Sequence, residues 1–229
     1  MNLVRDLHRH ERKQYSQNGE DGVIERLFEI VGVTNRCYVE LGTGSGEECN
    51  TRLLRERGWS GLMLDCAFEN EAIQLRREMI TAENVNGLFS KYAVPDEFDL
   101  LSIDIDGNDY WVWKALAPHY RPRVAVIEYN GGVPAELPVV MPYDATYRWM
   151  GQLNCGQSLG ALQKVSAAKG YALVYASPPN AFLVRRDLLP KRYRDVAPVK
   201  AQPIGWRIAN RASHLRWERE LRHLAWEYV

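Results

Sequence analysis

The sequence predicts an α/β fold built on one mostly parallel sheet that ends in an antiparallel hairpin. Three observations lead to this prediction. Short apolar runs alternate with helix-like segments, which is typical of a parallel sheet. A glycine-rich turn follows the first apolar run, and only a tight SPPN connection separates the last two runs. With 229 residues, 46% of them hydrophobic and 25% charged, the chain can bury the core of one such domain.

Residues 15–32 predict the first helix and a polar segment before it. The apolar residues of the helix recur at helical spacing: Val23, Ile24, Leu27, Phe28 and Val31. Gly32 is suited to end the helix. The polar segment includes Tyr15, Ser16, Gln17 and Asn18, whose side chains could either cap the helix or bond a ligand.

A glycine-rich turn connects the first two predicted strands. The first apolar run ends at Glu40, and three alternating glycines follow, Gly42, Gly44 and Gly46. A helix-like segment comes next, and the second apolar run ends at Asp65. Glycine adopts positive φ freely and has no Cβ, so a ligand can approach the backbone closely. The stretch therefore predicts a strand, a nucleotide-binding turn, a helix and a parallel strand.

The spacing of the glycines separates two classes of cofactor. A dinucleotide-binding turn follows the pattern GxGxxG, but Glu47 occupies the third glycine position here. The pattern is instead acidic-x-GxGxG, with Asp65 at the ~20-residue distance expected of a ribose ligand. This arrangement resembles motif I of the class I S-adenosylmethionine (SAM)-dependent methyltransferases. The structural alternative is a strand-to-helix turn that binds no ligand.

The segment after Asp65 predicts a helix-favouring stretch at Glu69–Glu78 and a third strand at Met79–Ala82. Asn84 and Val85 follow that strand. There, a polar and an apolar side chain would suit the edge and the face of an adenine ring. The alternative is structural, because Asn is also favoured at helix starts.

A second cluster of acids follows the fourth predicted strand. The run that ends at Ile103 is followed by Asp104, Asp106 and Asp109 around Gly107. These carboxylates repel one another unless a cation or an ammonium group lies nearby. Asp106 and Asp109 fit a structural role before a helix, where Asp is favoured. Asp104 directly follows a strand, where ligands bind in open α/β sheets.

The fifth predicted strand, residues 124–127, delivers Glu128 and Asn130 to the same edge. If the two strands are neighbours, the strand ends that bear Asp104 and Glu128 lie roughly 5 Å apart. Two carboxylates and an amide oxygen suit a hard divalent cation, so Asp104, Glu128 and Asn130 predict a Mg²⁺ site. Alternatively, Asp104 binds the ammonium group of SAM and Glu128 binds a substrate hydroxyl, without a metal.

Residues 130–157 predict a long loop, and loops of this length are usually functional. Its aromatic and charged residues, which include Tyr143 and Trp149, suit a polar substrate that contains a ring. A helix at Ser158–Lys169 and a hairpin of Tyr171–Ala176 with Ala181–Arg185 follow. This hairpin is the usual ending of the class I methyltransferase sheet, and the standard dinucleotide fold lacks it.

Five pieces of the chain, taken in order, resemble the FkbM-type SAM-dependent methyltransferases: YSQNGEDG, YVELGTGSGEE, ENVNGLF, SIDIDGNDYW and VIEYNG. They cover most of Tyr15–Arg185. The resemblance implies a single-domain, Rossmann-like class I methyltransferase fold and methyl transfer from SAM, usually to oxygen, on a sugar or another small metabolite. Members often carry an acidic-Gly-x-Glu turn, whereas this chain has Asp109 at the last position of that turn.

Together, the motifs and the resemblance predict roles for particular residues. The predicted cofactor residues are Gln17, Glu40, Gly42, Thr43, Gly44, Asp65, Cys66, Asn84, Val85 and Asp104. The predicted substrate residues are Tyr15, Asn130, Tyr143 and Trp149. Asp104 and Glu128 are the predicted catalytic residues, because the SAM sulfonium already activates the methyl group and the enzyme has only to align the acceptor and remove its proton. The alternatives are an N-methyltransferase and a noncatalytic nucleotide-binding or scaffold protein.

The formal net charge is zero, which gives no global electrostatic reason to expect a nucleic-acid partner. No apolar run approaches the ~18 residues of a membrane span, and the N-terminal residues lack a signal core. We therefore expect a cytoplasmic protein that acts on a small molecule without membrane insertion. The four cysteines form no CxxC pair and no Cys/His metal spacing, which favours reduced thiols.

Residues 190–229 form a basic C-terminal extension to the predicted methyltransferase domain, residues 1–189. The extension has nine Lys or Arg against four Asp or Glu. Trp217, Leu221, Leu224 and Tyr228 recur at helical spacing and predict an apolar stripe. The stripe predicts a homodimer, although most such stripes pack on their own domain, and an acidic partner or a membrane surface are further alternatives.

Overall fold

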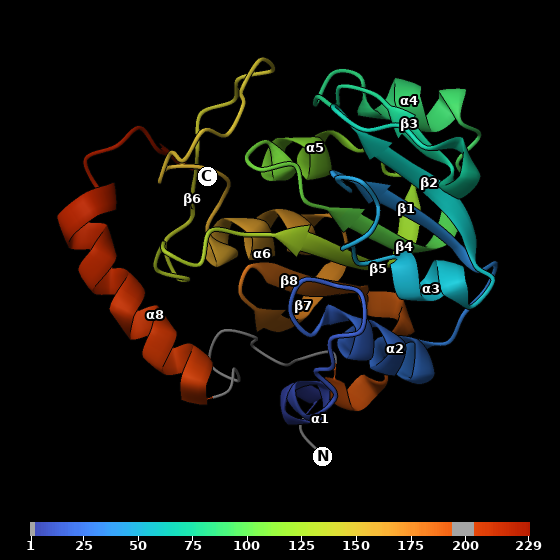
Figure 1. Cartoon of the computed structure of the whole chain (residues 1–229). Helices are drawn as coiled ribbons and strands as arrows, with labels where there is room; N and C mark the ends of the chain where they lie inside the picture. Colours follow the sequence, from blue (N-terminus) through green and yellow to red (C-terminus); the bar gives the residue numbers. More distant parts are fainter. Residues whose placement is uncertain (1–2, 194–203) are drawn as a thin grey trace.

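The computed structural model describes residues 3–193 and 204–229 and has three layers, with a sheet between two layers of helices (Figure 1). Seven strands form the large sheet in the order β3-β2-β1-β4-β5-β8-β7. The strands from β3 to β5 are parallel, whereas β8 pairs antiparallel with both β5 and β7. The predicted fold class, a mostly parallel Rossmann-like sheet that ends in an antiparallel hairpin, is confirmed.

The strands of the large sheet have these bounds: β1 Cys37–Leu41, β2 Ser60–Asp65, β3 Leu75–Arg77, β4 Glu97–Ile103, β5 Arg121–Glu128, β7 Tyr171–Ser177 and β8 Asn180–Arg185. A small two-stranded sheet pairs β6 Val139–Val140 with β9 Glu227–Tyr228. The α-helices are α1 Leu3–Arg9, α2 Glu20–Val31, α3 Arg52–Glu56, α4 Val85–Lys91, α5 Asp109–Ala115, α6 Leu159–Ala168 and α8 Ile204–Arg216. Short 3₁₀ turns cover Glu71–Ile73, Arg186–Leu188 and Lys191–Tyr193, and a π-helical turn covers Trp217–Leu221.

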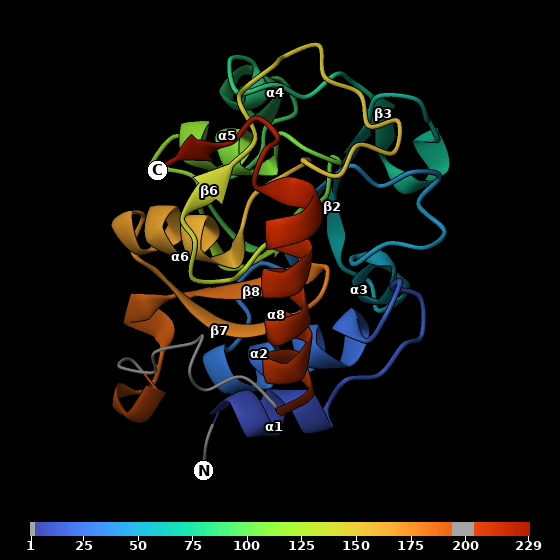
Figure 2. The same cartoon turned by 90° about the vertical axis from the view of Figure 1, so that its left-hand side faces the viewer.

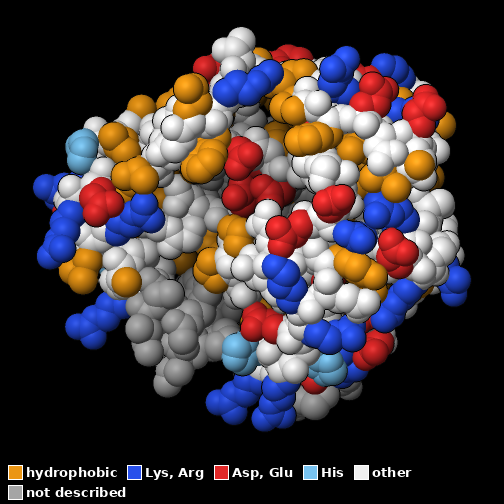
Figure 3. Space-filling model, viewed as in Figure 1, with side chains coloured by type: hydrophobic (Ala, Val, Ile, Leu, Met, Phe, Trp, Pro, Cys, Tyr) orange, Lys and Arg blue, Asp and Glu red, His pale blue; other side chains and the backbone are white. Residues whose placement is uncertain are grey.

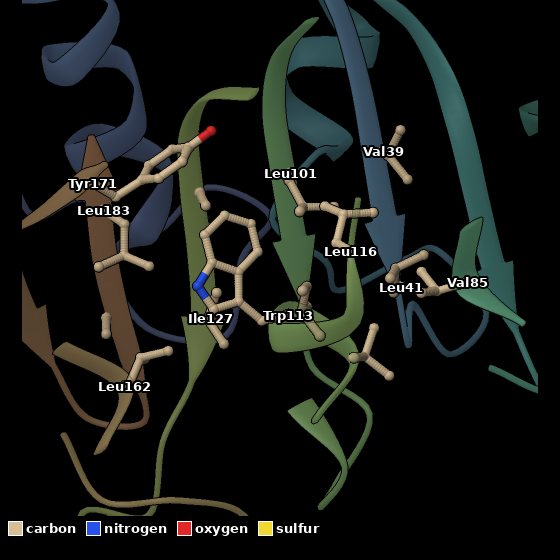
Figure 4. Packing of buried hydrophobic residues seen from close by; sticks show 14 of the residues in the cluster. Val39, Leu41, Val85, Leu101, Trp113, Leu116, Ile127, Leu162, Tyr171 and Leu183 are labelled. Carbon is tan, nitrogen blue, oxygen red and sulfur yellow. The ribbon is translucent and has the colours of Figure 1, made fainter. Parts of the chain in front are cut away.

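The helices cover both faces of the sheet, with α1, α2 and α3 on one face and α4, α5 and α6 on the other (Figures 1 and 2). One apolar core lies between the sheet and α4, α5 and α6. In it, the ring of Trp113 packs 5.1 Å from the ring of Tyr171, beside Ile127 and Leu183 (Figure 4). The second core joins the other face to α1 and α2. Burial on both faces explains why β4 and β5 are continuous apolar runs in the sequence.

Several predicted elements are present where the sequence placed them. Helix α2 ends before Gly32, whose φ is +77° and whose N–H donates to the Phe28 carbonyl. Helix α6 follows Ser158, whose side chain accepts from the Ala161 N–H as an N-cap. Strands β7 and β8 form the predicted hairpin. These elements combine a strong periodic pattern with a clear cap or turn.

The third strand and the cap of α2 differ from the predictions. The strand is β3, which falls inside the stretch that was predicted to be helical, and Met79–Ala82 forms no strand. Helix α2 has no side-chain N-cap bond within the described residues. Instead, the Asp21 carboxylate in its first turn accepts from the backbone N–H groups of Gln14, Tyr15 and Ser16. Asp21 therefore fixes the polar segment before the helix, in place of the predicted cap.

The C-terminal residues pack along the long loop between β5 and α6. Helix α8 lies outside the layers of the large sheet (Figure 1). Trp217 and Leu221 are buried in a small cluster with Val133 and Val139, and β9 pairs with β6. The predicted helical stripe is only half helical, because the helical run ends at Leu221, Leu224 lies in a bend beyond it, and Tyr228 lies in β9 and is 70% exposed. Residues 194–203 of the predicted extension lie outside the described residues.

No helix in the described ranges is both long enough and apolar enough to cross a membrane.

Candidate functional site

Five residues, each at the end of one of five neighbouring strands or directly beside it, lie in one row at the carboxyl edge of the parallel strands. We call them the edge row: Asp65, Gly42, Asp104, Glu128 and Asn180. The residues next to them in the chain are partners in register across the sheet: Leu64, Leu41, Ile103, Ile127 and Ala181. Glu128 and Asn180 are themselves paired directly across β5 and β8. The sheet therefore brings a turn glycine, three carboxyl groups and an amide to the edge where ligands bind in such folds.

A cavity of about 450 Å³ opens at this edge. On the face of the molecule that Figure 3 shows, acidic side chains gather in a hollow near the middle. Nine of the residues predicted from the sequence line the cavity: Gln17, Glu40, Gly42, Thr43, Gly44, Asp65, Cys66, Asp104 and Trp149. The cavity is large enough for a small organic cofactor.

The glycine turn has the positive φ angles that its glycines predict. Gly42 has a φ of +81°, and a Cβ there would lie 1.7 Å from the Asp104 carbonyl oxygen. Gly44 has a φ of +52° and lines the cavity, and no heavy atom of the described residues lies within 4 Å of the position of a Cβ. Gly42 is thus needed for close packing against β4, whereas Gly44 leaves an open approach to the backbone.

Asp65 is held by backbone N–H groups at the end of β2. One oxygen accepts from Gly44 at 2.8 Å, and the other accepts from Ala67 at 2.7 Å and Phe68 at 3.2 Å. The side chain is buried but still lines the cavity. A carboxylate offers about four acceptor sites, so Asp65 retains capacity for a ligand hydroxyl.

Glu40 also lines the cavity, but its carboxyl group is engaged within the protein. It accepts from the backbone N–H groups of Asn50, at 2.8 Å, and Thr51, at 3.0 Å, and from the Thr51 hydroxyl. Burial raises the pKa of Glu40. These bonds tie β1 to the start of α3, so Glu40 helps to shape the turn.

Three carboxyl groups form a cluster at the middle of the edge row. Oxygen atoms of Asp104, Asp106 and Glu128 all lie within 4.8 Å of one another. Burial, and then the nearby charges of Asp109 and Asp106, raise the pKa of Asp104 to about 8. Burial and the charge of Asp104 raise the pKa of Glu128 as well, and the two side chains hydrogen-bond to each other. The pair therefore retains at least one proton at neutral pH.

The other nearby acid, Asp109, has a structural role at the start of α5. Its oxygens accept from the backbone N–H groups of Ile105, at 2.8 Å, and Gly107, at 2.9 Å. Burial nevertheless raises its pKa to about 6. The sequence favoured a structural role for both Asp106 and Asp109. The structure gives that role to Asp109 alone, because Asp106 belongs to the carboxyl cluster.

Asn130 was predicted as a metal and substrate ligand, but the structure gives its side chain other partners. Its Nδ2 donates to the carbonyls of Leu153 and Cys155, both at 3.0 Å, and its Oδ1 accepts from the Gly132 N–H. Asn130 does not line the cavity. The Asn130 amide closes the long loop. Asp106, and not Asn130, is the third possible metal ligand beside Asp104 and Glu128.

The predicted adenine residues lie just behind the cavity wall. Asn84 bonds the Thr81 N–H through Oδ1 and the Met79 carbonyl through Nδ2, and Val85 is buried in the core. Neither lines the cavity, whereas Met79 and Ile80 do. Asn84 therefore holds the turn that presents two apolar side chains.

Two predicted substrate residues also lie away from the cavity lining. Arg52 stacks over the ring of Tyr15 at 4.4 Å from its centroid. The Tyr143 hydroxyl accepts from the Ala82 N–H and donates to Glu83, which fastens the long loop to the turn after β3. Further along this loop, Tyr147, Arg148 and Trp149 line the cavity. Of the predicted aromatic pair, only Trp149 lies at the cavity.

Two asparagines at the cavity, Asn108 and Asn180, were not predicted as site residues. Both are buried, and neither Oδ1 atom has a hydrogen-bond partner in the part of the chain that the structure describes. Asn108 donates through Nδ2 to the Asp144 carbonyl at 2.8 Å, which ties the long loop to the start of α5. Asn180 lies in the SPPN connection and resembles a turn residue in sequence. Only the pairing of β8 with β5 reveals that it lies opposite Glu128.

No protein-family model matches the chain, and a search of curated proteins finds no match. Among solved structures, three methyltransferases that were determined with bound S-adenosylhomocysteine (SAH) are similar at low sequence identity. MycE from the mycinamycin biosynthetic pathway, which also contains Mg, has 17% identity and a TM-score of 0.40 over 70% of this chain. The chain spans only 44% of the length of MycE.

The second structure is the magnesium protoporphyrin IX methyltransferase ChlM from Synechocystis PCC 6803. It has 11% identity and a TM-score of 0.43, over 80% of this chain and 85% of its own. The third is the 1,6-didemethyltoxoflavin-N1-methyltransferase from Burkholderia thailandensis, with 13% identity and a TM-score of 0.40, over 70% of this chain and 73% of its own. These similarities are too low to assign a family or an activity, so the fold is assigned from the strand order.

Proposed function

We propose that this protein is a SAM-dependent methyltransferase that methylates a hydroxyl oxygen of a sugar or another small metabolite. The edge row supports this proposal, because it aligns a ribose-type carboxylate, a glycine turn and a proton-holding carboxyl pair at one edge of the sheet. Asp65, Gly42 and Asp104 of this row line the cavity, whereas Glu128 contacts it only through its bond to Asp104. A structural turn alone would need no cavity and no carboxyl pair beside it.

The residues at the cavity fit the parts of SAM. Asp65 has free acceptor capacity for ribose hydroxyls, and Gly44 leaves the backbone open beside it. The apolar side chains of Met79 and Ile80, together with Phe68, form a surface suited to the faces of an adenine ring. The carboxyl pair lies further along the row, where the methyl end would reach.

SAM would supply a methyl group that its sulfonium charge already activates. The residues of this chain then have to orient the acceptor and accept its proton. In its ionised form, Asp104 can accept the hydroxyl proton of the acceptor, and the hydrogen bond from Glu128 stabilises that ionised form. Tyr147, Arg148 and Trp149 line the same cavity and can contact the acceptor.

A divalent cation is a second group that the site fits. The oxygens of Asp104, Asp106 and Glu128 are close enough to converge on one ion, and carboxylate oxygens are the ligands that Mg²⁺ prefers. Bound there, the ion would offset the repulsion among the three carboxylates and lower the pKa of an acceptor hydroxyl. The alternative is that the positive charge of SAM itself offsets this repulsion.

The cofactor assignment is tested by isothermal titration calorimetry of the full chain with SAM, SAH and NAD. We expect SAM and SAH to bind and NAD to give no heat of binding, because Glu47 replaces the third glycine of a dinucleotide turn. Binding of NAD alone would contradict the proposal.

Catalysis is tested separately with Asp104→Asn, which keeps the shape of the side chain but cannot accept the proton of the acceptor. Methyl transfer from labelled SAM to a panel of hydroxylated and aminated metabolites identifies the acceptor and shows whether O or N is methylated. We expect the variant to bind SAM as the wild type does but to lose roughly 10²-fold in turnover. A chain that binds SAM yet methylates no acceptor, with or without Mg²⁺, would favour the noncatalytic alternative.

A further inference from the structure

We propose that Asn180 binds the ammonium group of the cofactor through its Oδ1 atom and that Glu20 fixes the amide in the orientation this requires. The inference rests on the proposed function and adds to it a recognition residue that the sequence motifs do not contain.

The side-chain oxygen of Asn180 is a buried acceptor at the cavity. Asn180 is 2% exposed and lines the cavity. Its Nδ2 donates to Glu20 Oε1 at 3.0 Å, whereas its Oδ1 has no partner among the described residues. A buried acceptor that is left unpaired costs free energy, so most such atoms in native proteins have a partner. A ligand N–H in the cavity would satisfy this oxygen.

Glu20 determines which end of the amide faces the cavity. Burial alone would raise the pKa of Glu20, but hydrogen bonds from Asn180 and Asn18 outweigh burial, and its pKa is lowered. The backbone N–H and the Nδ2 of Asn18 also donate to this carboxylate, at 2.8 and 3.1 Å, so Glu20 acts as an acceptor and takes a donor from Asn180. If the amide rotated by 180°, the Asn180 oxygen would face this carboxylate, and two acceptors would oppose each other. The NH₂ group thus stays on Glu20, and the oxygen remains available.

The surroundings of Asn180 favour a cationic ligand group. Glu128 is its direct partner across the strands, and Asp104 hydrogen-bonds to Glu128. Among the described residues that line the cavity, Arg148 is the single Lys or Arg. Ionised Glu20 beside the amide, and an excess of acids over bases in the cavity lining, therefore favour an ammonium group over a carboxylate at this oxygen.

The acid beside the glycine turn, Glu40, is a poor alternative acceptor for the ammonium group. Glu40, the acid that precedes this turn, already accepts three hydrogen bonds within the protein. Four interstrand steps separate Asp65 from Asn180 along the row, which is roughly 19 Å between backbones. An extended SAM molecule, with its hydrogen bonds at both ends, spans a distance of this order.

The test compares two defined ligands by calorimetry. SAH carries the amino-acid group, and 5′-methylthioadenosine has the same adenosine and sulfur without it. We expect Asn180→Ala to weaken SAH binding roughly 10-fold or more, the effect of losing a hydrogen bond to a charged group, and to leave methylthioadenosine binding unchanged. Glu20→Gln should weaken SAH binding in the same selective way, because a neutral partner no longer fixes the amide.

Asn18→Ala is the matched control, because Asn18 is exposed and its side chain also donates to Glu20 but does not line the cavity. It should leave binding of both ligands unchanged, because the backbone N–H at this position still donates to Glu20 and Asn180 is untouched. Retained binding of methylthioadenosine shows that a variant is folded, and Asn180→Ser replaces Asn180→Ala if the latter is not. Equal losses for both ligands, or full SAH affinity in the Asn180 variant, would overturn the inference. Failure of the wild-type chain to bind SAH would instead overturn the proposed function.

Discussion

Asp65, Asp104 and Glu128 each follow or end an apolar strand, but their partners give them different chemistry. Three backbone N–H groups, those of Gly44, Ala67 and Phe68, donate to the Asp65 carboxylate and fix its position at the cavity. Asp104 and Glu128 instead face each other with few donors, and burial raises both pKa values. The same position on a strand therefore yields a hydrogen-bond acceptor for ligand binding in one case and a proton-holding pair in the other.

The role of Asp65 gives the first prediction. Asp65→Ala should weaken SAH binding by roughly 1 to 3 kcal/mol, because ribose hydroxyls would lose their acceptor in a buried site. Calorimetry measures this change, and Glu69→Ala is the control, since Glu69 is an exposed acid on the same connection that does not line the cavity. Unchanged affinity in Asp65→Ala would remove Asp65 from the binding site.

The carboxyl cluster gives a prediction about stability and pH. The pKa of Asp104 is about 8 in the folded protein, against an ordinary value of 3.8. The folded state therefore binds more protons than the unfolded state between these values, and the free energy of unfolding should fall as pH rises through this window. A bound divalent cation favours the ionised carboxylates and should oppose that fall. Mg²⁺ should then raise the melting temperature more at about pH 8 than at about pH 5.

Thermal unfolding with Mg²⁺ and with a chelator, at both pH values, measures the effect. The double variant Asp104→Asn with Glu128→Gln is the control, since it keeps the shape of the pair and should lose the Mg²⁺ dependence. An equal effect of Mg²⁺ at both pH values would argue against a metal at the cluster.

The carboxyl groups that directly follow buried strands could be predicted as a pair from the sequence, whereas the contribution of Asp106 could not. Asp104 and Glu128 were predicted because each follows a buried run, and the register of β4 and β5 brings them together. Asn130 occupies a similar place in the sequence, just after a strand, but its amide closes the long loop. Asp106 belongs to the cluster and has a φ of +57°, and the residue type alone reveals neither.

At the scale of elements, the turn between β1 and α3 is the most constrained part of the site. Gly42→Ala should lower the free energy of unfolding by roughly 3 kcal/mol or more, because the new Cβ would meet the Asp104 carbonyl at 1.7 Å. Gly58→Ala is a matched control: its φ is +78°, but nothing among the described residues lies within 4 Å of its Cβ position. This control should cost only about 1 to 2 kcal/mol of backbone strain.

Chemical denaturation of the two variants compares the losses, and SAH binding should be lost only in Gly42→Ala. Similar losses of stability in both variants would mean that the turn can relax around a side chain. The close packing of Gly42 against β4 would then not be required for the site.

Elements with strong periodicity were predictable, and the weakly patterned third strand was not. Helix α2, helix α6 and the hairpin each combine several apolar positions with a clear stop signal. Strand β3 has only three residues, two of them arginines, and it pairs with β2 alone at the edge of the described sheet. Short polar edge strands depend on their neighbour for their conformation, so a local pattern does not reveal them.

At the scale of the whole molecule, the C-terminal extension supports the segment that leads to the cavity. Strand β9 pairs with β6, and Asn210 and His214 of α8 contact the backbone of Ala135 and the side chain of Glu136. These contacts lie at one end of the loop that carries Tyr147 and Trp149. The sequence showed an apolar stripe in the extension but not its partner, because packing across nearly a hundred residues leaves no local pattern.

The homodimer remains a prediction for the intact chain. The structure buries Trp217 and Leu221 of the stripe against the chain itself, whereas Leu215 and Tyr228 are 61% and 70% exposed and available to a second copy. Light scattering at micromolar concentration should give a dimer for the full chain and a monomer for a chain truncated near Pro190. A monomeric full chain, or a truncated chain that remains dimeric, would limit the extension to packing within one molecule.

The central claim is that the edge row binds SAM with its ribose at one end and its reacting methyl group near the carboxyl pair. A crystal structure of the full chain with SAH tests this most directly. We predict ribose hydroxyls within hydrogen-bond distance of Asp65, the sulfur on the side of Asp104 and Glu128, and the amino group at Asn180. SAH bound elsewhere, or bound in the reverse direction with its ribose beside Glu128, would contradict the account.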